Sequence, residues 1–97
     1  MRFSWDARKS NRKLRERGFD FEFAMQIFEG STLERADSRR DYGEHRVVAL
    51  GNAQDITVTV VYTDLAESSG EVNRQIISAR KSNRREREAY KKATGAK

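Results

Sequence analysis

The spacing of apolar residues changes once along the chain, from a mainly helical period to a period of two. Before residue 31 the period is helical, except at 2–5, where alternating polar and apolar residues predict a short strand. From residue 31 onward the alternation predicts strands over 32–36, 44–50, 56–63 and about 72–80. Turn-forming residues separate these strands at 37–43, at Gly51–Asn52 and at 68–70.

The first predicted helix is polar over most of its length. It covers residues 7–17, between a candidate N-cap, Asp6, and Gly18, a residue suited to the left-handed end of a helix. Its apolar content is low, and we expect Leu14 and Ala7 to be the buried positions. Most of its surface should therefore be cationic and face solvent or a ligand.

Two further helices are predicted. One starts after Asp20, has apolar residues at helical spacing, and ends before Gly30. The other covers about 84–93, with Ser82 or Asn83 as its N-cap. The order is then strand, two helices, three or four strands joined by short turns, and a helix. This order predicts an α+β fold with an antiparallel sheet in a single domain, residues 1–97.

Composition excludes several classes of chemistry. The chain has no Cys and a single His, so a thiol nucleophile, a disulfide framework and a Cys-based zinc site are excluded, and we expect no metal or cofactor. The longest apolar run, Val47 to Leu50, is too short to cross a bilayer, and no signal peptide is visible. We therefore expect a cytoplasmic protein without a membrane partner.

The net charge of +5 is unevenly distributed. Residues 1–17 hold seven basic and two acidic side chains, residues 80–92 hold the same numbers, and the rest of the chain is acidic. Dense Lys and Arg are typical of proteins that bind a polyanion. They are also compatible with solvated helix faces, or with a docking face for an acidic partner. Charge alone leaves these alternatives open.

Common catalytic patterns are missing from the sequence, including Ser-His-Asp, Cys-His and glycine-rich phosphate loops. RNA cleavage needs none of them, because the 2′-hydroxyl of the substrate supplies the nucleophile. The protein has only to accept a proton, stabilise negative charge on the phosphorus centre and protonate the leaving oxygen. A carboxylate and a few arginines suffice for this.

Two predicted strands carry polar side chains where a core-facing pattern would have Val or Ile. On one of them, alternation places Glu44 and Arg46 on the same face, about 7 Å apart. On the last strand, Arg74, Ser78 and Arg80 share one face. These spacings are compatible with a catalytic site. The alternative for the first pair is an ion pair at the edge of the sheet.

Trp5 and His45 are the other residues that could carry chemistry. Trp5 is the only Trp, and it is either a core anchor or a platform for a base. His45 has an ordinary pKa of about 6.5, which suits acid–base chemistry. It is out of phase with the polar pair on its strand, which argues against a catalytic role.

The chain as a whole resembles the BrnT family of ribonuclease toxins from type II toxin–antitoxin systems. The matching motifs are Phe3-x-Trp5-Asp6, Leu14 with Gly18 and Phe21, Ala24 to Phe28, Asp37, Glu44-x-Arg46, Gly51, Ile76-Ile77-Ser78-Ala79-Arg80-Lys81, Arg84-Arg85-Glu86-Arg87 and Tyr90. The block from Ile76 to Lys81 is the most specific of these. Departures from the family pattern occur at Lys13, Arg17 and Gln75, where the family commonly has Asn, His and Arg.

The resemblance implies a RelE-like fold and a metal-independent endoribonuclease that arrests growth by cutting RNA. It also implies neutralisation by a BrnA-like antitoxin in a hetero-oligomer, expected to be a heterotetramer, which binds operator DNA only through the antitoxin. The alternative is a non-catalytic basic module that binds nucleic acid, or a corepressor subunit of the antitoxin complex.

Carried onto this chain, the resemblance favours Trp5, Glu44, Arg46 and Arg80 as functional residues. We assign Glu44 as the proton acceptor and Arg46 and Arg80 as the groups that stabilise the phosphate. An Arg side chain stays protonated because of its high pKa, so it is not expected to act as a base. The candidate substrate-binding residues are Trp5, Lys9, Arg74, Lys81 and Arg84. Arg74 is a possible substitute for an Arg at position 75.

Overall fold

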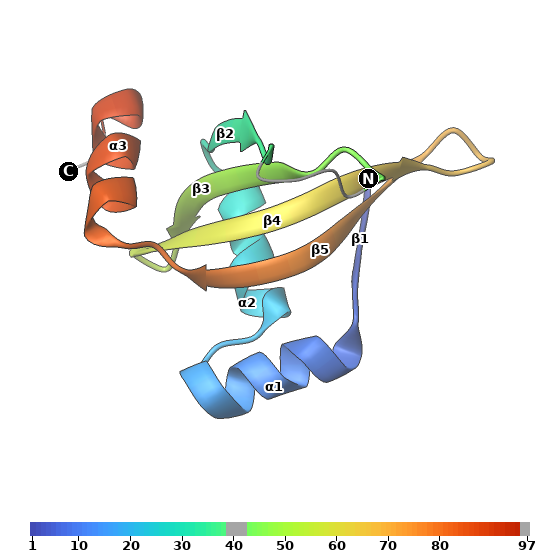
Figure 1. Ribbon diagram of the computed structural model, residues 1–97, viewed down its shortest axis with the longest axis horizontal. Coiled ribbons are helices and arrows are strands. Elements are labelled where there is room, and N and C mark those ends of the chain that lie inside the picture. The colour runs from blue at the N-terminus through green and yellow to red at the C-terminus, as the bar shows by residue number, and fades with distance from the viewer. Residues whose placement is uncertain (39–42, 96–97) are drawn as a thin grey trace.

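The computed structural model describes residues 1–38 and 43–95, which form one sheet with helices on both faces (Figure 1). The elements are β1 (Arg2–Trp5), α1 (Ala7–Arg17), α2 (Phe21–Ala24), the short 3-10 helix η1 (Met25–Glu29), β2 (Leu33–Ala36), β3 (Val47–Ala53), β4 (Ile56–Ala66), β5 (Val72–Lys81) and α3 (Arg84–Thr94). The strand order across the sheet is β1-β5-β4-β3-β2. The predicted α+β class is confirmed.

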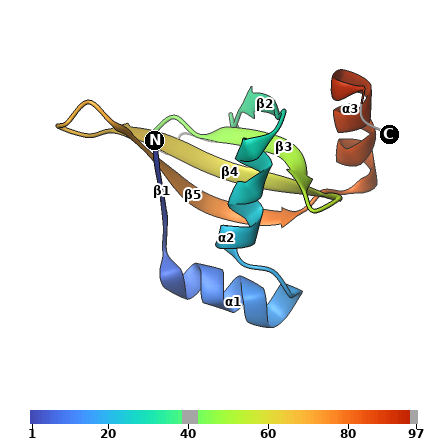
Figure 2. The same cartoon turned by 180° about the vertical axis from the view of Figure 1, so that it is seen from behind.

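The sheet is mixed, which corrects the prediction of an antiparallel sheet. Strands β2 to β5 pair antiparallel with one another, as expected for strands that follow one another along the chain. Strand β1 pairs in parallel with β5 and adds a fifth strand at that edge. The chain then crosses one face of the sheet through α1, α2 and η1 before β2 forms the opposite edge (Figure 2). The short turns of the sequence do not reveal this long-range pairing.

Helix α1 has the predicted ends but a different buried face. The Asp6 carboxylate accepts a hydrogen bond from the backbone N–H of Arg8, and Gly18 ends the helix at a φ of 82°. The expectation that Leu14 and Ala7 are buried is wrong, because Leu14 is 48% exposed and Ala7 is also exposed. Ser10 is the buried position instead, and its hydroxyl accepts a hydrogen bond from Phe21 N–H.

The core lies between α2, η1 and the sheet face that they cover. Asp20 caps α2 through Phe23 N–H, as predicted, and the continuation as a 3-10 helix ends at Gly30. The buried apolar cluster consists of Phe19, Phe21, Ala24, Ile27, Ala49, Ala53, Val58, Val60, Tyr62, Ile76 and Ala79. The second face also has buried residues, among them Val48, Leu50, Thr59 and Val61.

The β3–β4 hairpin turns later than predicted. Strand β3 continues through Gly51 and Asn52, and the turn is made by Gln54 and Asp55, both with positive φ. Two such residues make a hairpin turn whose twist matches that of the strands. Gly51 serves packing instead, because a Cβ atom at this position would lie 2.6 Å from the Cβ of Ile27.

A register shift between Val61 and Tyr62 of β4 reverses the alternation of side chains along β5. Tyr62 pairs with Ile76 while Val61 pairs with Ser78, so Ile77 is the extra residue of a β-bulge. The predicted common face for Arg74, Ser78 and Arg80 is therefore wrong.

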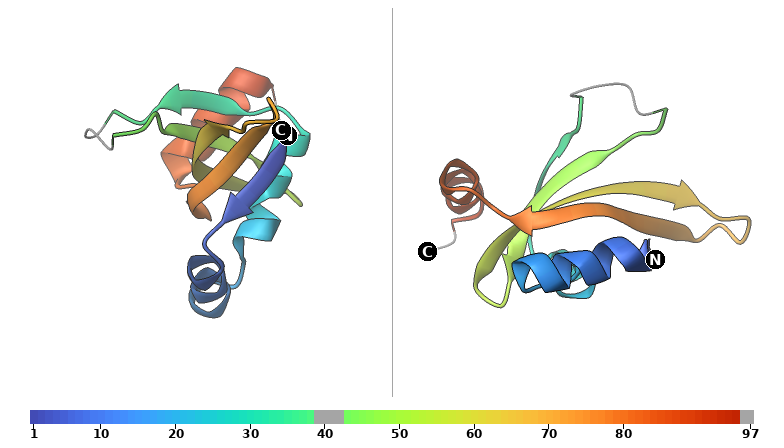
Figure 3. Two further views of the ribbon diagram at one scale, coloured as in Figure 1. Left: turned by 90° about the vertical axis from the view of Figure 1, so that its right-hand side faces the viewer. Right: turned by 60° about the horizontal axis from the view of Figure 1, so that its bottom comes forward.

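Beyond the bulge the chain leads into α3, which packs at the end of the sheet on its second face, near β2 and β3 (Figure 3). Asn83 caps this helix with a reciprocal capping box to Glu86. Of the helices in the described part of the chain, none is long and apolar enough to span a membrane.

Candidate functional site

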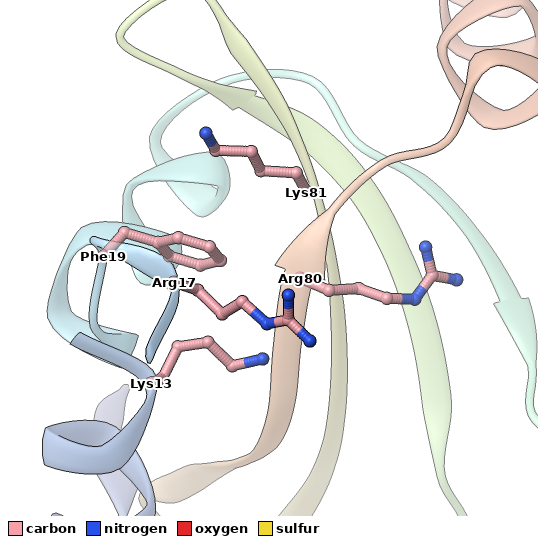
Figure 4. A pocket seen from close by; sticks show the side chains of 5 residues that line it. All are labelled: Lys13, Arg17, Phe19, Arg80 and Lys81. Atoms are coloured by element: carbon pink, nitrogen blue, oxygen red, sulfur yellow. The ribbon is translucent and has the colours of Figure 1, made fainter. Parts of the chain in front are cut away.

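A cationic groove runs between helix α1 and the last residues of β5. It has a volume of about 500 Å³ and is lined by Lys13, Arg17, Phe19, Arg80 and Lys81. Figure 4 shows Lys13, Arg17 and Lys81 around the Phe19 ring, while the Arg80 guanidinium points away from them. Four basic side chains from two elements 63 or more residues apart in sequence thus converge on one surface.

The groove exists because β1 covers only part of the β5 edge. Strand β1 pairs with residues Asn73 to Ile76, and in the part of the chain that the structure describes no strand lies beside the edge of β5 beyond Ile76. Helix α1 lies along this open edge (Figure 3). The ammonium group of Lys9 donates a hydrogen bond of 3.3 Å to the carbonyl of Ile77, the bulged residue. Lys9, a predicted binding residue, thereby joins α1 to the strand.

The groove attracts anions because its cations are not neutralised. Within residues 1–38 and 43–95, no carboxylate forms an ion pair with Lys13, Arg17 or Lys81. The ammonium group of Lys13 lies 6.0 Å from the centre of the Phe19 ring. A phosphate in the groove would therefore gain cationic partners without first displacing a protein carboxylate.

Arg80, the main sequence candidate, lies at the border between the groove and the second face of the sheet. It pairs with Thr59 across the sheet, on the face opposite to Lys81. Its guanidinium donates two hydrogen bonds, of 2.6 and 2.8 Å, to the carboxylate of Glu86. These bonds, with a backbone N–H from Asn83, hold the pKa of the Glu86 carboxyl below its usual range. The arrangement fixes the Arg80 side chain, which is still 53% exposed.

Glu44 and Arg46 precede β3 and do not lie on it as predicted. Their side chains form an ion pair of 3.3 Å between Arg46 Nε and Glu44 Oε2, the alternative that the sequence left open. His45 between them is exposed, and its carbonyl accepts a hydrogen bond from the Thr63 hydroxyl. Arg80 is level with Thr59 on β4 and with Leu50 on β3, so the pair lies two strand spacings across the sheet from Arg80, about 10 Å, and at least four residues along it, about 13 Å.

Arg74 lies on the other face of the sheet, where its side chain contacts Asp64, Tyr62 and Phe28. It donates two hydrogen bonds to Asp64, at 2.8 and 2.9 Å, which raise the pKa of the guanidinium. Its guanidinium carbon also lies 4.0 Å from the Tyr62 ring centre and 4.8 Å from that of Phe28. Burial raises the pKa of the Tyr62 hydroxyl, which donates to Glu34. This placement gives no support to Arg74 as a substitute for an Arg at position 75.

The remaining candidates are separated from the groove or lie at its edge. Trp5 is partly buried and packs against the core cluster, which agrees with the anchor interpretation. Arg84 is on α3, 86% exposed, and forms an ion pair with Glu88. Among the described residues no group of three or more His, Cys, Asp or Glu side chains could hold a metal ion.

Lys13 and Arg17 were not among the predicted binding residues, although the sequence contained a signal for them. Together with Lys9 they recur every four residues in α1, which puts all three on one side of the helix. Which side of α1 faces β5 could not be predicted, because the expected burial of Leu14 and Ala7 was wrong. The sequence shows the spacing of these three residues, but only the packing of α1 against β5 shows that they face the groove.

Comparison with known proteins gives one family. A family model described as "Ribonuclease toxin, BrnT, of type II toxin-antitoxin system" matches residues 5–86. This range includes α1, the whole cationic groove and the start of α3 as far as Glu86. A search of curated proteins finds no match.

Proposed function

Since the chain belongs to the BrnT family of ribonuclease toxins of type II toxin–antitoxin systems, we propose that it cleaves RNA without a metal ion. The observation that carries this proposal is the groove next to Arg80, in which Lys13, Arg17 and Lys81 have no carboxylate partner among residues 1–38 and 43–95. A single-stranded RNA contributes one negative charge per nucleotide and fits an extended cationic surface. The groove binds the RNA backbone, and Arg80 acts at its border.

In the proposed reaction the 2′-oxygen of the substrate attacks the adjacent phosphorus. The bond from phosphorus to the 5′-oxygen breaks, which leaves a 2′,3′-cyclic phosphate, and the 5′-oxygen takes a proton from water to become a hydroxyl. Arg80 stabilises the additional negative charge on the phosphate oxygens, because a guanidinium offers paired donors and stays charged. Glu44 lies too far from Arg80 to accept the 2′-proton at the same phosphate, so this proton passes to water, and Glu44 orients its ion-pair partner Arg46, which binds another phosphate of the RNA.

For this reaction the RNA must reach from the groove onto the second face of the sheet. Arg80 points away from the groove toward that face, and Glu44 and Arg46 precede β3 on the other side of β4. An RNA strand that crosses the β5 edge would contact both regions. Lys9 and Lys81 are proposed to contact phosphates along this path, with Trp5 and Arg84 in secondary roles.

We further propose that the fold is RelE-like and that residues 1–97 act as one domain. A type II system pairs a toxin with a protein antitoxin, and we propose a BrnA-like antitoxin in a heterotetramer with this chain. Binding of operator DNA would then occur only through the antitoxin. The mixed sheet with helices on both faces is compatible with this assignment.

The test is cleavage of a labelled RNA by the purified protein in the presence of EDTA. Arg80→Ala should lower the cleavage rate about 100-fold, because it removes donors aimed at developing charge. Glu44→Gln should lower it by less than about fivefold, because Glu44 acts only by orienting Arg46. Arg2→Ala is the matched control, since Arg2 is also exposed and forms an ion pair with a glutamate, Glu67, far from the groove.

Three outcomes would contradict the proposal. Cleavage only after addition of a divalent cation would refute metal independence. Retarded migration of RNA without cleavage would favour the non-catalytic binding module. Full activity of a folded Arg80→Ala variant would remove Arg80 from the site, with folding checked by circular dichroism.

A further inference from the structure

A second pocket, of about 330 Å³, lies beside the cationic groove and is mainly apolar. Its apolar lining comes from Leu14 on α1, Phe19 and Phe23 around the start of α2, and Ile56 and Val58 on β4. Helix α1, the following loop and the β3–β4 hairpin therefore contribute to one concave surface. Of the residues proposed to bind or cleave RNA, only Lys81 lines this pocket.

Two residues of this pocket are unusually exposed for their type. Leu14 is 48% exposed and Ile56 is 37% exposed, and they are two of the four large exposed hydrophobic residues in the described part of the chain. Single exposed apolar side chains are common on protein surfaces. Two that line the same pocket as the buried Phe19 and the partly buried Phe23 instead indicate an interaction site.

The apolar pocket is continuous with the cationic groove, because Phe19 and Lys81 line both. Lys13 and Arg17 flank Leu14 along α1. The one carboxylate at the pocket, that of Asp20, accepts the capping hydrogen bond from Phe23 N–H. The pocket is thus an apolar recess beside three cations that no carboxylate of the described residues neutralises.

We propose that the pocket and the groove together form a docking surface for an acidic protein segment that inserts an apolar side chain. The carboxylates of the segment would lie on Lys13, Arg17 and Lys81, and its Leu-like or Ile-like side chain would fill the pocket. Aliphatic side chains such as Leu14 and Ile56 suit a peptide better than a nucleobase, which stacks on an exposed aromatic face. Phe19 is only 8% exposed and offers no such face.

The partner that carries this segment is the antitoxin, an assignment that rests on the proposed toxin function. Its acidic groups and the RNA backbone would occupy the same three cations. Bound antitoxin would therefore inhibit cleavage by direct competition with RNA. The apolar pocket would give the antitoxin binding energy that RNA does not share.

The probes are two fluorescein-labelled peptides rich in Glu, one with a central Leu and one with Ser in its place, and a labelled uridine oligonucleotide. We expect the native protein to bind the Leu peptide at least about tenfold more tightly than the Ser peptide. Leu14→Gln should remove most of this difference, and Ile56→Thr should reduce it. Neither change alters charge, so binding of the oligonucleotide should stay within about twofold.

Leu65→Gln is the matched control, because Leu65 is 44% exposed but lies outside the pocket on the far part of β4. It should keep the preference for the Leu peptide. In cells, the co-expressed antitoxin should neutralise Leu65→Gln but not Leu14→Gln, while both variants remain toxic alone.

Equal binding of the two peptides by the native protein would overturn the inference. So would an unchanged preference in Leu14→Gln, or a selective loss of oligonucleotide binding in Leu14→Gln and Ile56→Thr. The last result would assign the pocket to RNA. A native protein that binds the Leu peptide but does not cleave RNA would refute the proposed function and leave the docking surface standing.

Discussion

Residues 1–17 and residues 80–92 each contain seven basic and two acidic side chains. In the folded protein, the basic side chains of the two stretches have different partners. On α1, Lys13 and Arg17 face the groove without a carboxylate partner among the described residues. In the second stretch, Arg80 forms two hydrogen bonds with Glu86, and Arg84 forms an ion pair with Glu88. Lys81 of the second stretch joins Lys13 and Arg17 in the groove, so the surface open to an anion draws on both stretches, whereas Arg80 and Arg84 are already paired with glutamates.

The positions of the acidic residues determine which basic side chains have a carboxylate partner. Glu86 is the third residue of α3, where its carboxylate completes the capping box and also reaches Arg80. Asp6 and Glu16 on the first stretch have no such relation to the groove, and Asp6 caps its own helix. The position of two or three carboxylates, more than the number of cations, decides which surface can take a polyanion.

The largest expected effect comes from reversing charge in the groove. Lys13→Glu with Arg17→Glu should weaken binding of single-stranded RNA by about 100-fold at low salt and reduce the salt dependence by about 1.4 in the log–log slope. Replacing Arg84 and Arg85 with Glu should weaken RNA binding by less than about fivefold. Fluorescence anisotropy across a salt series measures both. Equal losses in the two double variants would show that the surfaces are equivalent.

A smaller effect is expected at Arg74, a cation that is neither open nor at the surface. Arg74→Met should lower the free energy of unfolding by about 2 kcal/mol, because it removes the contacts with Tyr62, Phe28 and Asp64. RNA affinity at a temperature where the variant is folded should stay near that of the native protein. Urea unfolding and anisotropy test the two parts, and a selective loss of RNA affinity would place Arg74 in the binding site.

The Arg80–Glu86 pair should make stability depend on pH. Because the folded-state pKa of Glu86 lies below its unfolded value of about 4.3, the pair stabilises the fold fully above about pH 5. This contribution is lost as the pH falls through the lowered pKa. Glu86→Gln keeps the capping hydrogen bond but should cost about 1 kcal/mol at pH 7 and nothing at low pH. Thermal unfolding at pH 7 and pH 3 checks this, and an equal cost at both values would contradict it.

The smallest effect is expected at the exposed pair of α3. Arg84→Ala should change the free energy of unfolding by less than about 0.5 kcal/mol, because both side chains of the Arg84–Glu88 pair are well solvated. RNA cleavage should be close to that of the native protein. A strong loss of cleavage in this variant would give α3 a direct part in substrate binding.

Local sequence signals predicted much of the secondary structure. Asp6, Asp20 and Asn83 cap helices as expected, because a short polar side chain can satisfy free backbone N–H groups from its own position. The β3–β4 turn was misplaced, since Gly51 is used for contact with Ile27 and two non-glycine residues make the turn. A glycine signals freedom of the backbone or close approach, and the sequence does not distinguish them.

The candidate site was predicted less well than the fold. Arg80 and Lys81 both line the groove, but Lys13 and Arg17 were missed and Arg74 lies on a different face. The error at Arg74 comes from the bulge at Ile77, because one extra residue reverses every side chain that follows it, and Lys13 and Arg17 were missed because the buried face of α1 was predicted wrongly. Strict alternation, applied to 72–80, could not have shown this.

The sequence by itself determined where the helices are capped, which segments form strands, and that both charged stretches are strongly basic. These properties depend on interactions between residues a few positions apart. Only the tertiary structure decided that β1 joins β5, that α1 lies along the open strand edge, and which cations lack a carboxylate. Those properties depend on contacts between residues more than 60 positions apart, such as Lys9 with Ile77. Such contacts leave no periodic trace in a single sequence.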